Sequence, residues 1–141
     1  VTELGVKRIV PLVTERTLPD HAKSERWQKL ALAAMKQSGR AYLPQVDKLT
    51  PLAEFLSEPV VSDLKLIAHE KANERISMNH LLDKQYRSVA LLIGPEGGFS
   101  DDEIQLSIEK GYASVNLGKR RLRTETAATV LSALALLLDG D

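Results

Sequence analysis

The sequence contains no cysteine, so disulfide scaffolds, thiolate zinc sites and cysteine nucleophiles are excluded. It also has no excess of either charge, because 19 Lys and Arg residues balance 19 Asp and Glu residues. This balance disfavours a protein that binds nucleic acid through bulk electrostatic attraction, since such proteins usually carry a basic excess. Residues 1–40 nevertheless hold eight basic and four acidic residues, so this part of the chain could present a basic face.

Long hydrophobic runs are also lacking. The longest nearly apolar run, residues 127–138, contains Thr129 and Ser132 and is shorter than the roughly 20 residues that a membrane span requires. We therefore expect a buried helix there and no membrane partner. The three histidines are scattered without paired carboxylates, so no metal site is predicted. No signal peptide is visible, but the sequence begins with Val1 rather than Met, and we expect the true N-terminus to lie upstream.

Short strands and helices alternate along the chain. Strands are expected at 6–13, 63–68, 88–93 and 113–117, with a short extended piece at 42–46; helices are expected at 21–37, 50–57, 100–110 and 124–138. The polar segment 73–87 is expected to be rich in loops. This alternation predicts one α/β domain with a mostly parallel sheet and flanking helices, which is what 141 residues can build.

Local signals mark the expected helix ends. Gly5 is a natural helix stop before the first strand, and Gly39 closes the first long helix. Thr50 is expected to cap the second helix, with Pro51 at its first helical position. The segment Ser100–Glu103 reads as a capping box that opens the third helix.

Ligands of open parallel sheets sit beyond the carboxyl ends of the strands, so the loops that leave these ends are the candidate site. One of them, residues 94–100 (GPEGGFS), has three glycines in five residues, which allow positive φ and close approach of backbone amides to a ligand. It is neither a Walker loop nor a GxGxxG fingerprint. A small-molecule cradle and a tight strand-to-helix turn both remain open from the loop alone.

The last of these loops packs four cations into five positions, Lys119 to Arg123. Such a run is often a solvated face, but arginines here could equally bind phosphates or a carboxylate with their fork geometry. Thr124 or a neighbour can cap the following helix, and Glu125 in its first turn suits the helix dipole.

Four segments together resemble one known family. The segments are LLIGPEGGFSDDEI (91–104), LGKRRLRTETAA (117–128), ERW…QSGR (25–40) and TELGV (2–6). They are similar to the RsmE family, methyltransferases of the SPOUT superfamily that methylate N3 of a uridine in 16S ribosomal RNA. The resemblance implies an S-adenosylmethionine-dependent enzyme whose α/β domain ends in a C-terminal trefoil knot, against the general rule that chains do not thread their own loops. The family usually also has an N-terminal PUA-like RNA-binding domain and one more strand before TELGV. This chain shows neither, so residues 1–141 are expected to be the catalytic domain alone, with an N-terminal strand missing from its sheet.

The resemblance also implies which residues bind the cofactor, with backbone groups of Leu117 and Leu122 on the adenine and with Gly94 and Gly97 leaving room for its bent shape. The implied cofactor-binding residues are Ile67, Ala68, His69, Glu70, Gly94, Glu96, Gly97, Gly98, Leu117, Gly118, Arg120, Leu122, Arg123 and Thr124.

Methyl transfer to a uridine nitrogen requires loss of the N3 proton, because the neutral imide nitrogen is a poor nucleophile. Arg123 and Arg120 are the candidate catalytic cations that would stabilise the resulting anion, and Glu96 is the candidate acid/base, with Glu125 as the alternative. Arg26, Arg120 and Arg121 are candidate contacts to the RNA substrate. Trp27 is either part of the core or a base-stacking platform, with helical spacing favouring the core.

The expected partners are small-subunit ribosomal RNA or the 30S subunit and a second copy of the chain, paired through the knot region. The expected location is the cytoplasm, or an organelle if a leader has been removed. Two alternatives remain: a related methyltransferase acting on another RNA position, such as a tRNA ribose hydroxyl, and a noncatalytic RNA-binding or assembly module.

Overall fold

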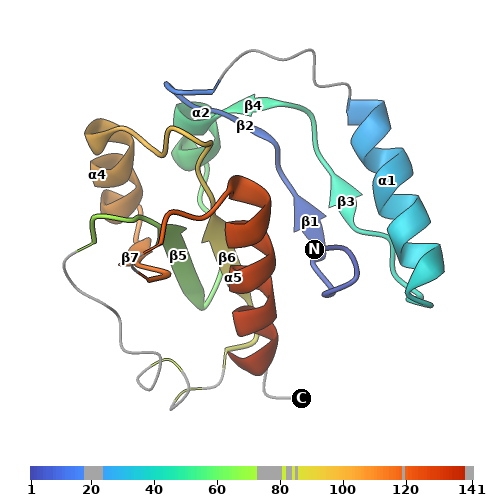
Figure 1. Cartoon of the computed structure of the whole chain (residues 1–141). Coiled ribbons are helices and arrows are strands. Elements are labelled where there is room, and N and C mark those ends of the chain that lie inside the picture. The colour runs from blue at the N-terminus through green and yellow to red at the C-terminus, as the bar shows by residue number, and fades with distance from the viewer. Residues whose placement is uncertain (18–23, 73–80, 82–83, 85, 119, 139–141) are drawn as a thin grey trace.

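The chain alternates helices with short parallel strands, as the sequence predicts (Figure 1). The computed structural model describes residues 1–17, 24–72, 81, 84, 86–118 and 120–138. All strand pairs within these residues are parallel. The expected loop region 73–87 falls mainly outside the described residues.

A three-stranded sheet forms the centre of the C-terminal half. Its order is β6 (Val89–Leu92), β5 (Leu64–Ala68), β7 (Ala113–Val115), so β5 is the middle strand. Neighbouring residues of β5 face opposite sides: Ile67 packs with α2 and α4 residues, whereas Leu66 packs with α5 residues. Helices therefore cover both faces of this sheet, which explains why β5 is apolar apart from Lys65, whose ammonium donates to the Lys110 carbonyl at 3.2 Å.

In the described part of the chain the strands are accompanied by the helices α1 (Ser24–Gln37), α2 (Leu52–Ser57), α4 (Asp101–Glu109) and α5 (Thr124–Leu138). The predicted capping box is confirmed, because Ser100 Oγ accepts from the Glu103 amide while the Glu103 carboxylate accepts from the Ser100 amide. The apolar helix α5 is only partly buried. Leu131 is 1% exposed, but Leu137 is 69% exposed, so one face of this helix is left open.

The N-terminal half contributes a narrow parallel ribbon made of two pairs, β1 (Arg8–Ile9) with β3 (Gln45–Val46) and β2 (Leu12–Val13) with β4 (Thr50–Pro51). The single strand expected at 6–13 is thus interrupted around Pro11, which has no amide hydrogen to donate. The expected role of Thr50 as a helix cap is wrong. Its amide donates to the Pro11 carbonyl at 2.9 Å, which draws Thr50 and Pro51 into the ribbon, and α2 starts one residue later.

The TELGV and QSGR segments meet at the base of the ribbon. The guanidinium of Arg40 donates to the Glu3 carbonyl at 2.8 Å. Gly5 has a φ of +87°, and a β-carbon there would lie 2.5 Å from the Arg40 guanidinium. Both the backbone conformation and the close approach therefore require glycine at this position, which identifies a structural reason for the two segments to occur together.

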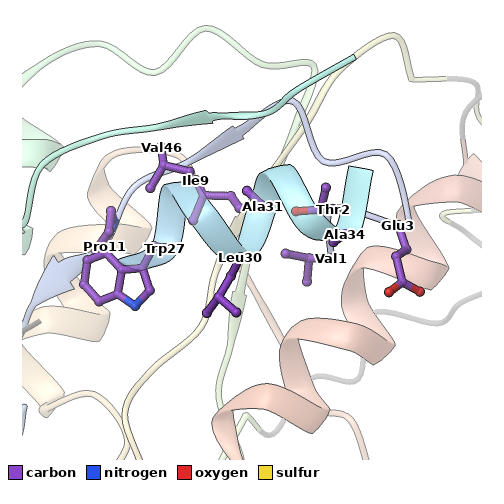
Figure 2. Close-up of a pocket in the computed structure, with 10 residues that line it drawn as sticks. All are labelled: Val1, Thr2, Glu3, Ile9, Pro11, Trp27, Leu30, Ala31, Ala34 and Val46. Atoms are coloured by element: carbon purple, nitrogen blue, oxygen red, sulfur yellow. The ribbon is translucent and has the colours of Figure 1, made fainter. Parts of the chain in front are cut away.

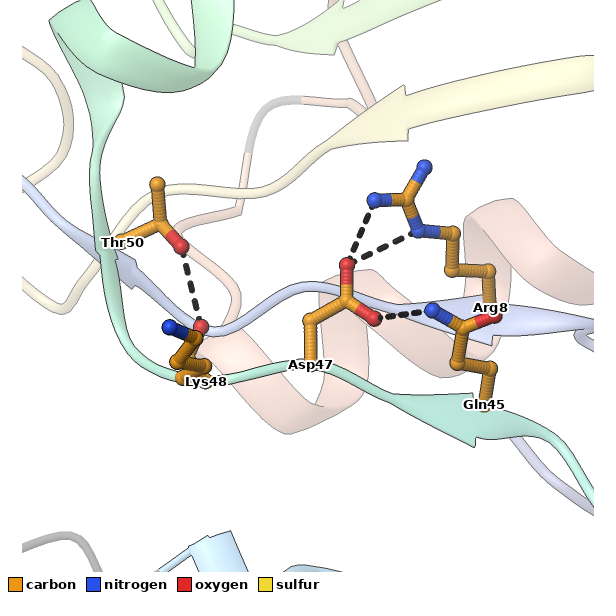
Figure 3. A network of polar contacts seen from close by, with 5 residues as sticks. All are labelled: Arg8, Gln45, Asp47, Lys48 and Thr50. Atoms are coloured by element: carbon orange, nitrogen blue, oxygen red, sulfur yellow. Dashed lines mark hydrogen bonds and ion pairs between the residues drawn. The ribbon is translucent and has the colours of Figure 1, made fainter.

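An ion pair joins β1 to the residue that follows β3 (Figure 3). Arg8 Nη2 lies 2.6 Å from Asp47 Oδ2, and Gln45 donates to the other carboxylate oxygen at 2.7 Å. Burial alone would raise the pKa of Asp47, but the hydrogen bonds from Arg8 and Gln45 and the charge of Arg8 outweigh it and hold this pKa below its ordinary value of 3.8.

Because the folded pKa of Asp47 is lowered, its contribution to stability is present above the unfolded pKa and is lost as pH falls through the folded value. We expect Asp47→Asn to lower the free energy of unfolding at pH 7 by less than about 1 kcal/mol, since Arg8 is largely exposed. The difference from the wild type should shrink on acidification from neutral pH to below pH 3.8. Urea unfolding at both pH values measures it, with the exposed Glu58→Gln as control. A difference that stays constant with pH would contradict the assignment.

Candidate functional site

The carboxyl ends of β5, β6 and β7 lie at one edge of the sheet. Ile67 is in register with Leu92 and Ala68 with Val115, so the residues that follow these strands start side by side. The His69 amide donates to the Val115 carbonyl at 3.0 Å, which continues the pairing one residue into the loops. Ile67 is fully buried, whereas Ala68 and His69 are half-buried and border the edge. The structure thus gathers in one place the starts of the three loops that leave β5, β6 and β7, as expected for the carboxyl ends of parallel strands.

Side-chain hydrogen bonds tie these loops to one another. The Thr124 hydroxyl, expected to cap α5, donates instead to the Gly94 carbonyl at 2.8 Å and joins the glycine loop to the start of α5. The carbonyl of Arg123 accepts from the Ala127 amide and opens the helix. Asn116 donates to the Glu70 carbonyl and accepts from the Gly118 amide, both at 2.8 Å, and so joins the β5 and β7 exits.

The glycines of the site divide into two kinds. Gly98 and Gly118 have φ values of +69° and +120°, and among the described residues no atom beyond each glycine and its chain neighbours lies within 4 Å of where the β-carbon would be. Glycine is therefore needed there for backbone conformation, and the space beside it is open to a ligand. Gly94 and Gly97 do not have positive φ. Their missing β-carbons instead make room for Phe99 and Arg16 respectively.

The charged candidates stand on the outside of these loops. The exposed side chains are those of Glu96, Arg120, Arg121, Arg123 and Glu125, the last in the first turn of α5. Arg121 Nε lies 3.5 Å from the Glu70 carboxylate, an exposed pair that adds little stability but links the arginine loop to the β5 exit. Leu117 and Leu122 are half-buried on either side of the arginines. Lys119 lies outside the described residues.

Arg26 is not brought to the strand ends. It is exposed on α1, which Figure 1 shows on the far side of the β1–β3 ribbon from the three-stranded sheet. Its neighbour Trp27 is half-buried and lines an apolar cavity of about 340 Å³ between α1 and the ribbon (Figure 2). Glu3 is the one ionisable side chain among the residues that line this cavity. We therefore do not propose the cavity as the site of catalysis. The apolar residues that line this cavity favour the interpretation of Trp27 as part of the core over its role as a base-stacking platform.

Two residues of the site were missed by the sequence analysis, Arg16 and Asn116. Asn116 carried a usable signal, because an asparagine directly after a strand often accepts from the amide two residues on. Arg16 carried none, since its hydrogen bond to the Gly97 carbonyl spans 81 residues of sequence. Within the described part of the chain no three His, Asp or Glu residues gather as metal ligands, and no described helix is long and apolar enough to cross a membrane.

Comparison with known proteins points to one family. A family model described as an RNA methyltransferase domain matches residues 1–136. Among curated proteins, the chain is 40% identical over 133 residues to the ribosomal RNA small subunit methyltransferase E of Synechocystis, covering 92% of this chain and 44% of that protein. It is 34% identical to the protein of the same name from Mesomycoplasma hyopneumoniae, covering 92% and 57%. The chain thus spans about half the length of the curated relatives it matches.

Solved structures agree with this match. A methyltransferase from Legionella pneumophila with bound cofactor SAM superposes with a TM-score of 0.82 at 39% identity, covering 96% of this chain and 56% of that one. A ribosomal RNA small subunit methyltransferase E from Neisseria gonorrhoeae, bound to S-adenosyl methionine, gives 0.82 at 33% identity, covering 98% and 57%.

Proposed function

Because this chain belongs to the RNA methyltransferase domain family, we propose that it transfers a methyl group from S-adenosylmethionine to N3 of a uridine in small-subunit ribosomal RNA. The observation that carries the proposal is the junction of three strand-end loops at one sheet edge, closed by the Thr124–Gly94 hydrogen bond. The likeness to two structures that contain this cofactor supports it.

The residues at the sheet edge fit the cofactor. The open space beside Gly98 and Gly118 lets a ligand approach the backbone, and the half-buried Leu117 and Leu122 offer apolar contact for an adenine. When bound, S-adenosylmethionine supplies an electrophilic methyl group. We propose that it is held by Ala68, His69, Gly94, Glu96, Gly97, Gly98, Leu117, Gly118, Leu122, Arg123 and Thr124. Ile67, which is fully buried, would support this edge from the core instead of touching the cofactor.

The exposed charged side chains around that space suit the uridine. Arg120 and Arg123 would donate to the uracil oxygens and stabilise the anion formed when N3 loses its proton. Glu96 would accept that proton directly or through water, since it is exposed at the tip of the glycine loop. Arg121, adjacent in the same loop, and Arg26 on α1 would contact RNA phosphates.

We further propose that the C-terminal segment is knotted and that two copies of the chain pair through α5. The knot proposal is supported by the hydrogen bond from the Thr124 hydroxyl to the Gly94 carbonyl, which holds the start of the C-terminal helix against the glycine loop. The exposed Val130, Leu136 and Leu137 on α5 support an apolar interface.

The molecular mass in solution, followed across a dilution series with cofactor present, tests the pairing of two copies. A dimer is expected, and a monomer at every concentration would contradict it. The proposed compartment is the one that holds the ribosomes, the cytoplasm or an organelle.

Methylation of 30S subunits that lack the modification tests the activity. The chain is incubated with S-adenosylmethionine and the subunits, and digested ribosomal RNA is analysed by nucleoside mass spectrometry. We expect 3-methyluridine. A 2′-O-methylated nucleoside in tRNA would instead favour the related ribose methyltransferases, and absence of cofactor binding by calorimetry would favour a noncatalytic module.

A further inference from the structure

A turn at residues 14–17, far from the glycine loop in sequence, lies against it in the fold. The turn is internally fixed, because the Thr14 amide donates to the Thr17 hydroxyl at 2.9 Å and the two hydroxyl oxygens lie 2.8 Å apart. Thr14 is 8% exposed, so the turn is anchored in the protein. It can therefore act as a rigid support for whatever it contacts.

Arg16 reaches from this turn across the glycine loop. Its Nη1 donates to the Gly97 carbonyl at 2.8 Å and to the Phe99 carbonyl at 3.3 Å, which bracket Gly98. Its aliphatic carbons lie 3.2 to 3.8 Å from the position a β-carbon on Gly97 would occupy. Since the φ of Gly97 is not positive, the presence of Arg16 is the reason the structure gives for glycine there.

The turn is held from a second side by α4. Glu103 accepts from the Glu15 amide at 2.8 Å through Oε1, while its Oε2 accepts from the Ser100 amide at 2.9 Å. The carboxylate of Glu103, which completes the capping box of α4, therefore also fixes the residue next to Arg16. Hydrogen bonds therefore connect the turn both to the end of the glycine loop and to the start of α4.

We propose that Arg16 is a positioning residue that sets the backbone of Gly97–Phe99 so that the open face of Gly98 receives the cofactor. The inference rests on the proposed binding of S-adenosylmethionine by this loop. Arg16 is exposed, so its hydrogen bonds compete with water and contribute little to overall stability. Its contribution lies in orientation, and its loss should weaken ligand binding far more than it lowers the free energy of unfolding.

Calorimetry with S-adenosylhomocysteine on the 141-residue chain tests this. We expect Arg16→Ala to raise the Kd on the order of tenfold and Arg16→Lys by a smaller factor, because lysine keeps the charge but not the fork. Arg8→Ala is the matched control: it removes an exposed arginine of β1 that pairs with Asp47, and it should leave the Kd within about twofold. The urea midpoint of Arg16→Ala should shift no more than that of Arg8→Ala.

One further measurement separates the possible failures. Hydrogen exchange of the Gly98 amide, which donates to the Pro95 carbonyl at 2.8 Å, should accelerate in Arg16→Ala but not in Arg8→Ala, with no ligand needed. If the wild type does not bind the ligand, the proposed function fails. If it binds and Arg16→Ala binds equally well, or exchange is unchanged, the positioning role is wrong.

Discussion

Ile67→Ala is expected to lower the free energy of unfolding by about 3 kcal/mol. Ile67 is fully buried in the middle strand of the three-stranded sheet, between residues of α2 and α4, and belongs to one cluster with Leu92 and Phe99. Removing three of its carbons leaves a cavity that neighbours from two strands and two helices cannot all close at once. Urea denaturation followed by circular dichroism measures the loss.

The matched control for this change is Val61→Ala, because Val61 is 92% exposed. Its effect should stay within about 0.5 kcal/mol. Ile67 also precedes the two residues that border the candidate site, so the weakened edge should bind S-adenosylhomocysteine less tightly as well. A loss below about 1 kcal/mol in Ile67→Ala would show that this strand is not the centre of the core.

Arg123→Ala is expected to lower kcat for methylation of 30S subunits by about 100- to 1000-fold, the usual cost of removing one donor that stabilises a developing anion. The side chain of Arg123 is exposed at the start of α5, while its carbonyl accepts the Ala127 amide and is untouched by the change. The helix should therefore keep its start, and the urea midpoint should remain close to that of the wild type.

Arg123 is proposed to contact both cofactor and uridine, and the kinetics separate these contacts. Loss of an anion-stabilising donor lowers kcat with the Kd of S-adenosylhomocysteine little changed, whereas loss of a cofactor contact raises the Kd alone. Arg8→Ala serves again as the control. Full turnover by Arg123→Ala would rule out the catalytic role, and a change confined to the Kd would assign the residue to cofactor binding only.

Local signals in the sequence were sufficient to predict several parts of the fold. The capping box at Ser100 and the bounds of α5 are confirmed because they depend on neighbouring residues. The gathering of the three loops is confirmed because parallel strands place their carboxyl ends together. The assignments of catalytic, cofactor and RNA contacts remain predictions.

What the sequence could not predict depends on distant partners. Thr50 and Pro51 look like a helix start, but pairing with β2 makes them a strand. The hydroxyl of Thr124 looks like a cap, but a carbonyl 30 residues away accepts from it. In both cases a contact set by the fold overrides a preference set by local sequence. The packing of Phe99 and Arg16 beside Gly94 and Gly97 is likewise set by the fold and could not be predicted from the glycine loop alone.

The all-parallel pairing of the described strands has a consequence for how the chain folds. No described strand can pair with the next one through a tight hairpin, since parallel neighbours need a long crossover. β1 gains a partner only when Gln45 of β3 has been synthesised, and β5 only when Leu91 of β6 has been synthesised. Folding dominated by such distant contacts is slow, and β5 emerges from the ribosome well before either neighbour. During synthesis its apolar sequence is therefore the segment for which we expect the greatest need of protection by chaperones.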